Sequence, residues 1–97
     1  MKIYISGRIT GLPYDQVERV FDTAQAYLEA QGFEVLNPTK NGLDPSASWE
    51  EHMAADLTML FSADGIYMLP GWQESKGAKV EYYVAHALEM PVYFSGL

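Results

Sequence analysis

Three side chains in the 97-residue sequence have types that suit chemistry and lie in elements that can bring them together. Glu81 lies inside a helix that is predicted to begin at Ser75. Asp56 lies in the middle of an earlier predicted helix, where aspartate is an unfavourable choice. Tyr4 lies in a short first strand. Two carboxylates in one pocket suit cleavage of a glycosidic bond, because one can attack or stabilise the anomeric carbon while the other handles the leaving group's proton.

The surroundings of Glu81 predict a ligand site. Residues 64–69 form a predicted apolar strand, residues 70–74 form a loop, and the helix follows. Ligands of open α/β sheets bind where strands end and helices begin. Ser75 and Gly77 place free N–H groups and a hydroxyl at the start of that helix, which suits a phosphate or a sugar hydroxyl.

Ordinary structural roles remain open for both acids. Glu81 could be an exposed helical carboxylate that pairs with Lys76 or Lys79. Asp56 could lie on a solvated helix face. From the residue pattern alone, the prediction is therefore a small α/β domain with a ligand site between Ser75 and Glu81.

The elements that position these residues alternate along the chain. Short strand patterns are followed by helical spacing, with glycine or proline at the boundaries. Strands are predicted at 2–6, 33–36, 64–69 and 92–94, and helices at 13–31, 48–61 and from 75 to about 89. This order predicts a three-layer, flavodoxin- or Rossmann-like parallel sheet of about four strands, in the order 2-1-3-4, with helices on both faces.

Each predicted helix carries an apolar stripe that is expected to be buried. The stripes comprise Val17, Val20, Phe21, Ala24, Tyr27 and Leu28 in the first helix, Met53, Leu57, Leu60 and Phe61 in the second, and Val80, Val84 and Leu88 in the last. Ser48 and Glu51 have the spacing of a capping box at the start of the second helix.

Composition limits the class of protein. The length suits one domain over residues 1–97, and a hydrophobic content of 48% favours a folded chain. The formal net charge of −7 argues against a nucleic-acid polymer or an anionic membrane as partner. Neither a signal-peptide pattern nor an apolar run that could span a bilayer is present, so the expected location is the cytoplasm.

No metal or cofactor is expected. Cysteine is absent, and His52 and His86 are isolated in the sequence, so surface or core roles are the simpler interpretation for both. The chain has neither the GxxxxGK[ST] pattern of P-loop NTPases nor the GxSxG pattern of α/β-hydrolases.

Three motifs, taken in order, resemble the nucleoside 2-deoxyribosyltransferase superfamily. They are YISGRITG at residues 4–11, ADL at 55–57 with Ala63-Asp64 after it, and SxGxxxE from Ser75 to Glu81. The set looks most similar to the deoxynucleoside 5′-monophosphate N-glycosidase branch and to related small bacterial and phage domains. The resemblance covers nearly the whole chain.

The resemblance implies a role for each matching residue. Glu81 matches the nucleophilic glutamate that forms a glycosyl ester at C1′, Tyr4 matches the tyrosine that orients it, and Asp56 matches the aspartate that assists departure of the base. The other residues expected to contact substrate are Ser6, Gly7, Arg8, Gly11, Trp72, Ser75 and Gly77.

Some of these contacts depart from the superfamily's pattern. The monophosphate branch has an arginine where this chain has Thr10, and Arg8 is the nearby candidate to replace it. Ser75 matches a serine that helps to bind the 5′-phosphate. Trp72 has no counterpart, and it is either a hydrophobic plug or a stacking surface for a base.

The resulting expectation is an N-glycosidase or deoxyribosyltransferase that acts on (deoxy)nucleosides or nucleoside 5′-monophosphates through a glutamate nucleophile. The expected partners are this small-molecule substrate and a second subunit, since the superfamily builds its sites across subunits. Two alternatives stay open: a nucleotide-binding module without chemistry, and a domain that assembles with a protein partner.

Overall fold

A four-stranded parallel sheet forms the centre of the computed structural model, which describes residues 1–95. The strands are β1 (Lys2–Ser6), β2 (Glu34–Leu36), β3 (Gly65–Met68) and β4 (Val92–Phe94). Their order is β2-β1-β3-β4, and every neighbouring pair is parallel. The predicted strand order is therefore confirmed.

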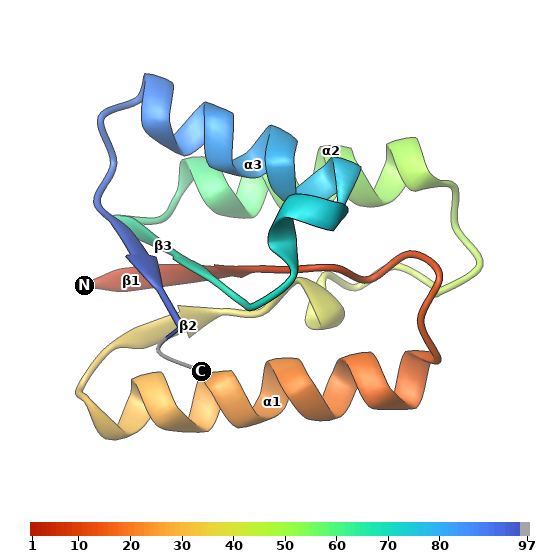
Figure 1. The fold of residues 1–97 in the computed structure, drawn as a ribbon, viewed down its shortest axis with the longest axis horizontal. Coiled ribbons are helices and arrows are strands. Elements are labelled where there is room, and N and C mark those ends of the chain that lie inside the picture. The colour runs from red at the N-terminus through yellow and green to blue at the C-terminus, as the bar shows by residue number, and fades with distance from the viewer. Residues whose placement is uncertain (96–97) are drawn as a thin grey trace.

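Helices cover both faces of the sheet, as predicted (Figure 1). Helix α1 (Tyr14–Ala30) lies along one face, while α2 (Trp49–Phe61) and α3 (Lys76–Ala87) lie along the other. Two short 3₁₀ segments, η1 (Pro38–Lys40) and η2 (Trp72–Glu74), follow β2 and β3. No helix within residues 1–95 has the length and apolar character needed to cross a membrane.

Serine caps set the starts of α2 and α3. The Ser48 hydroxyl accepts a hydrogen bond from the Glu51 N–H at 3.0 Å, and the Glu51 carboxylate accepts one from the Ser48 N–H at 3.1 Å. This is the predicted capping box. The Ser75 hydroxyl accepts a bond from the Ala78 N–H at 3.1 Å, which fixes the first turn of α3.

The pleat of β1 divides its side chains between two apolar cores. Ile3 and Ile5 pack with α1, whereas Tyr4 packs with the core beneath α2 and α3. Because successive side chains of a strand point to opposite faces, Ser6 shares the face of Tyr4. The first strand therefore delivers two hydroxyl groups to the side of the sheet that carries Asp56 and Glu81.

The predicted apolar stripes are wrong at four positions. Val20, Tyr27, Phe61 and Leu88 are 46%, 56%, 62% and 51% exposed, respectively. A helix that lies on one side of a sheet buries only a narrow arc, and Leu88 follows the last residue of α3. The arc that α3 buries consists of Ala78, Glu81 and Ala85.

Candidate active site

Glu81 is buried and held by two hydroxyl groups from β1. Its side chain is 4% exposed. The Tyr4 hydroxyl donates a hydrogen bond to Oε2 at 2.9 Å, and the Ser6 hydroxyl donates one to Oε1 at 2.6 Å. The alternative of an exposed acid that pairs with a neighbouring lysine is therefore excluded.

The environment of Glu81 shifts its acidity. Burial raises the pKa of Glu81, the hydrogen bond from Ser6 lowers it, the negative charge of Asp56 raises it, and the bond from Tyr4 lowers it. The net result is a pKa of about 7. Burial, together with the charges of Glu81 and Asp56, raises the pKa of Tyr4 well above its usual value, so this phenol remains a hydrogen-bond donor.

Asp56 is the second buried carboxylate, at 5% exposed. The Asn41 side-chain amide donates a hydrogen bond to Asp56 Oδ1 at 2.9 Å. Burial raises the pKa of Asp56, while the bond from Asn41 and the nearby His52 lower it. The solvated helix face considered for Asp56 is therefore also excluded.

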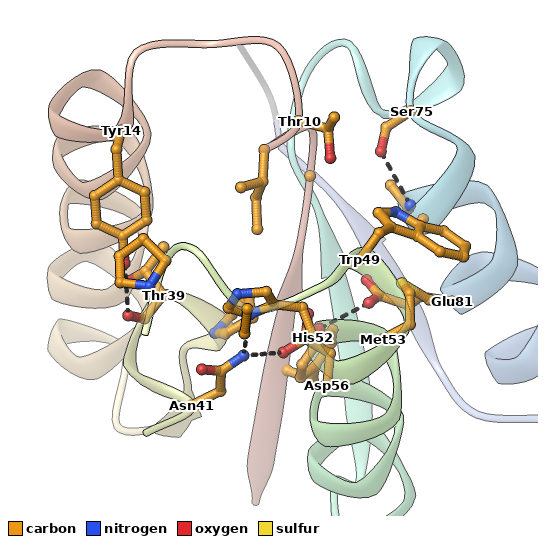
Figure 2. Close-up of a pocket in the computed structure, with 18 residues that line it drawn as sticks. Thr10, Tyr14, Thr39, Asn41, Trp49, His52, Met53, Asp56, Ser75 and Glu81 are labelled. Atoms are coloured by element: carbon orange, nitrogen blue, oxygen red, sulfur yellow. Dashed lines mark hydrogen bonds between the residues drawn. The ribbon is translucent and has the colours of Figure 1, made fainter. Parts of the chain in front are cut away.

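Both carboxylates line one cavity of about 410 Å³, a volume within the usual range for small-molecule sites. Figure 2 shows Thr10 and Ser75 at one end of this cavity, Asn41 and Asp56 at the other, and Glu81 on the wall between them. Apolar side chains complete the walls: Ile9, Tyr14, Pro38, Trp49 and Met53. The cavity therefore offers apolar walls to a flat apolar group and polar side chains to a group that carries hydroxyls.

Most of the predicted site residues lie at this cavity. Tyr4, Gly7, Asp56, Ser75, Gly77 and Glu81 line it. Ser6 does not line the cavity, and it contacts the site through its hydrogen bond to Glu81. Arg8 lines an adjoining recess that shares Thr10, Trp49, Ser75 and Gly77 with the cavity, and its guanidinium lies 3.9 Å from the Glu74 carboxylate.

Gly11 and Trp72 are placed elsewhere. Within residues 1–95, neither lines the cavity or the recess. Gly11 adopts a positive φ of 85°, so its role is the turn after β1. The Trp72 ring stacks on Tyr82 with centroids 4.7 Å apart and packs against the core beneath α3. The structure thus places Trp72 in the packing beneath α3, as in the plug interpretation, and not on the wall of the cavity.

The sequence pattern missed two polar residues of the site, Asn41 and His52. Asn41 follows β2, and His52 lies one helical turn before Asp56. His52 is isolated from the other histidine in the sequence, and in the structure its Nδ1 lies 3.0 Å from Asn41 Nδ2. The available signal was the position of Asn41 after a strand end, on the same edge of the sheet as the other site residues. Among residues 1–95, no group of three or more His, Asp or Glu side chains could hold a metal ion.

Comparisons with known proteins agree with this fold. A solved 2-deoxyribosyltransferase from the psychrotolerant bacterium Bacillus psychrosaccharolyticus superposes with a TM-score of 0.74 at 23% sequence identity. The match covers 97% of this chain and 71% of that one. That enzyme is described as a biocatalyst for the synthesis of antiviral and antitumoral nucleosides. No curated protein sequence matches the chain significantly.

The predicted resemblance to the 2-deoxyribosyltransferases is therefore confirmed for the fold. The family model described as "Domain of unknown function (DUF4406)" matches residues 1–94, which is nearly the whole chain. The chain therefore belongs to the DUF4406 family, and it has a 2-deoxyribosyltransferase-like fold.

Proposed function

We propose that this protein cleaves the N-glycosidic bond of (deoxy)nucleosides or nucleoside 5′-monophosphates and passes the sugar to water or to a second base. One observation carries the proposal. Glu81 is buried, bonded to Tyr4 and Ser6, and lines the same cavity as the second buried carboxylate, Asp56. Enzymes that hydrolyse glycosidic bonds commonly use a pair of carboxyl groups that lie in different surroundings.

The first step forms a glycosyl ester. The Glu81 carboxylate attacks C1′, the C1′–N bond breaks, and its electron pair leaves with the base. Asp56 in its acid form gives a proton to the departing base. Burial raises the pKa of Asp56, while the hydrogen bond from Asn41 and the nearby His52 lower it. Tyr4 keeps its proton and orients the Glu81 carboxylate.

The second step regenerates both carboxyl groups. Water attacks C1′, the ester bond to Glu81 breaks, and Asp56 now takes the proton of the water. If a second base attacks instead, the same sequence transfers the sugar. No cofactor enters either step.

The start of α3 suits the sugar end of the substrate. Ser75, Gly77 and Gly7 line the cavity there, and the helix N-terminus favours an anion or a hydroxyl oxygen. The adjoining recess is lined by the cations Arg8 and Lys76 and by the acids Glu50 and Glu74, and the Arg8 guanidinium lies 3.9 Å from the Glu74 carboxylate. A 5′-phosphate that extends from the sugar into this recess would compete with Glu74 for Arg8, so nucleosides and their monophosphates both stay in the proposed substrate class.

One observation favours a second candidate, nucleotide binding without chemistry. Both Glu81 oxygens already accept hydrogen bonds, and a pKa of about 7 leaves a large protonated fraction at neutral pH. A protonated glutamate is a poor nucleophile. The two candidates differ in whether a base is released.

The test is a panel of ribo- and deoxyribonucleosides and their 5′-monophosphates, with free base measured by chromatography. The proposal expects base release by the wild type and its loss in Glu81→Ala. Tight nucleotide binding by both proteins in calorimetry, without released base, would favour the binding candidate. Absence of both release and binding across the panel would contradict both.

A further inference from the structure

The segment after β2 contains two asparagines that hold aspartates in the same way. The Asn37 amide donates to Asp22 on α1 at 3.1 Å, and the Asn41 amide donates to Asp56 on α2 at 2.9 Å. Each side-chain carbonyl oxygen accepts an N–H from two residues later, Thr39 for Asn37 and Leu43 for Asn41. Only Asn41 lines the cavity.

The hydrogen bonds around Asn41 allow one proton arrangement. The Leu43 N–H occupies Oδ1 at 3.0 Å, so the NH₂ group must face Asp56 and His52. His52 Nδ1, 3.0 Å from Asn41 Nδ2, must therefore accept. The remaining ring nitrogen then carries the proton and donates it to the Asp44 carbonyl oxygen at 3.1 Å. His52 thus links the loop after η1 to α2.

This arrangement leaves one oxygen of Asp56 available. Asn41 occupies Oδ1, and the structure records no donor to Oδ2 within residues 1–95. No buried side-chain oxygen in that range lacks a partner, so Oδ2 is not sealed inside the protein. Oδ2 therefore keeps some exposed surface, and Asp56 is a wall residue of the cavity.

We propose that Asn41, itself held by His52, is a positioning residue that fixes Asp56 with its second oxygen directed to the departing base. This inference rests on the proposed glycosidic chemistry, because it assigns Asp56 the proton transfer. Asn41 touches Asp56 and acts through it.

The charged and titratable groups around Asp56 predict the effect of removing Asn41. Glu81 on α3 and Tyr4 on β1 share its cavity wall, and His52 lies on its own helix. The amide of Asn41 donates to the carboxylate and so favours its charged form. Without that donor, the proton stays on Asp56 to higher pH and the side chain can rotate.

The first experiment measures the free protein and needs no turnover. The pKa of Asp56 is determined by NMR titration of its carboxyl carbon in the wild type, Asn41→Ala and Asn37→Ala. Asn37→Ala is the matched control, because it removes the same kind of bond to Asp22 outside the cavity. The inference expects a higher Asp56 pKa in Asn41→Ala and an unchanged one in Asn37→Ala. An unchanged pKa in Asn41→Ala overturns it.

The second experiment separates positioning from folding. In Asn41→Ala, kcat is expected to fall about 10- to 100-fold, the usual effect of losing a hydrogen bond to a charged group, while KM changes little. With N7-methylated deoxyguanosine as substrate, the base leaves without needing a proton. The fall in kcat of Asn41→Ala should therefore be much smaller on this substrate. Equal losses on both substrates, or an equal loss in Asn37→Ala, would contradict the inference.

A second variant covers the case in which Asn41→Ala does not fold. His52→Ala keeps the donor but removes its anchor, so it should raise the pKa of Asp56 in the same direction. An unchanged Asp56 pKa in His52→Ala would overturn the role of His52. If the wild type releases no base, the proposed function fails, while the NMR comparison still decides whether Asn41 controls Asp56.

Discussion

Glu81 combines two opposing influences at the scale of a single residue. Burial makes its charged form less favourable, while the hydroxyl groups of Tyr4 and Ser6 donate to that same form. The balance leaves a carboxyl group that gains and loses its proton near neutral pH. A nucleophile must be in the charged form, so the pKa of Glu81 should be visible in the rate.

The pH dependence of kcat/KM tests this balance. In the proposed mechanism Glu81 must be deprotonated to attack, so activity should fall as pH decreases through about 7. Ser6→Ala removes a donor that lowers the pKa of Glu81, so the acid limb should move to higher pH. Ser62→Ala, a hydroxyl at the end of α2, serves as the control. An acid limb that stays in place in Ser6→Ala would contradict the assignment of this limb to Glu81.

Tyr4→Phe isolates the role of the phenol. The ring remains to fill the core, and only the hydrogen bond to Glu81 is lost. We expect kcat to fall about 10- to 100-fold, as for other hydrogen bonds to charged groups. Tyr27→Phe, at a position on α1 that is 56% exposed and away from the cavity, should have no effect. Full activity in Tyr4→Phe would show that Glu81 needs no orientation from β1.

At the scale of elements, two serine caps offer a matched comparison. Ser75 caps α3 and lines the cavity, whereas Ser48 caps α2 outside it. Each Ser→Ala change should lower the free energy of unfolding by about 1 kcal/mol, measured by urea denaturation. Only Ser75→Ala should also raise KM, because its hydroxyl faces the proposed sugar end. An equal rise in KM in Ser48→Ala would show that helix stability alone explains the effect.

The elements themselves were largely predictable from the sequence. Alternating strand and helix patterns gave the sheet order, and the capping spacing of Ser48 and Glu51 gave the start of α2. Burial was less predictable. Val20 and Tyr27 follow the apolar spacing of α1 but lie outside the arc that faces the sheet, and only the packed fold determines how wide that arc is.

The site was predictable where the fold topology fixes it. Tyr4 and Ser6 share a face of β1 because of the pleat, and a helix after β3 must lie over that sheet edge, so Glu81 could be placed near them. Asn41 lies in an irregular loop, so its position after a strand end indicates the correct edge of the sheet but not its contacts with His52 and Asp56. The stacking of Trp72 on Tyr82 was equally hidden from a local pattern, since the two residues lie on different elements.

At the scale of the whole molecule, the buried acid is expected to reduce stability. The pKa of Glu81 in the fold, about 7, lies above its ordinary value of 4.5. The unfolded chain therefore loses this proton first, and stability should decrease as pH rises from 4.5 to 7 and change little from this group above that range. This change of stability with pH has the opposite sign to that of a salt-bridged carboxylate, whose pKa is lowered in the fold.

Glu81→Gln should therefore stabilise the protein at pH 8. Removing the charge that burial disfavours should raise the free energy of unfolding by about 1–3 kcal/mol, with little gain at pH 4. Glu18→Gln, on the exposed face of α1, is the control. Chemical denaturation at both pH values makes the comparison. A loss of stability at pH 8 would show that the hydrogen bonds to Glu81 outweigh its desolvation.

We also expect the protein to form a homodimer. Large apolar side chains remain on the surface, including Phe61, Tyr83 and Phe94 at 62%, 64% and 56% exposed. Such side chains are common at subunit contacts. Size-exclusion chromatography with light scattering should give twice the chain mass. A monomer at every concentration would contradict this expectation.

Direct capture of the glycosyl ester tests the central claim. A deoxynucleoside from the panel is mixed with the enzyme, quenched with acid within the first turnovers, and examined by intact-mass and peptide mass spectrometry. The account predicts a sugar adduct on the peptide that contains Glu81 in the wild type, and neither adduct nor base release in Glu81→Gln. Base release that proceeds without an adduct and persists in Glu81→Gln would contradict it.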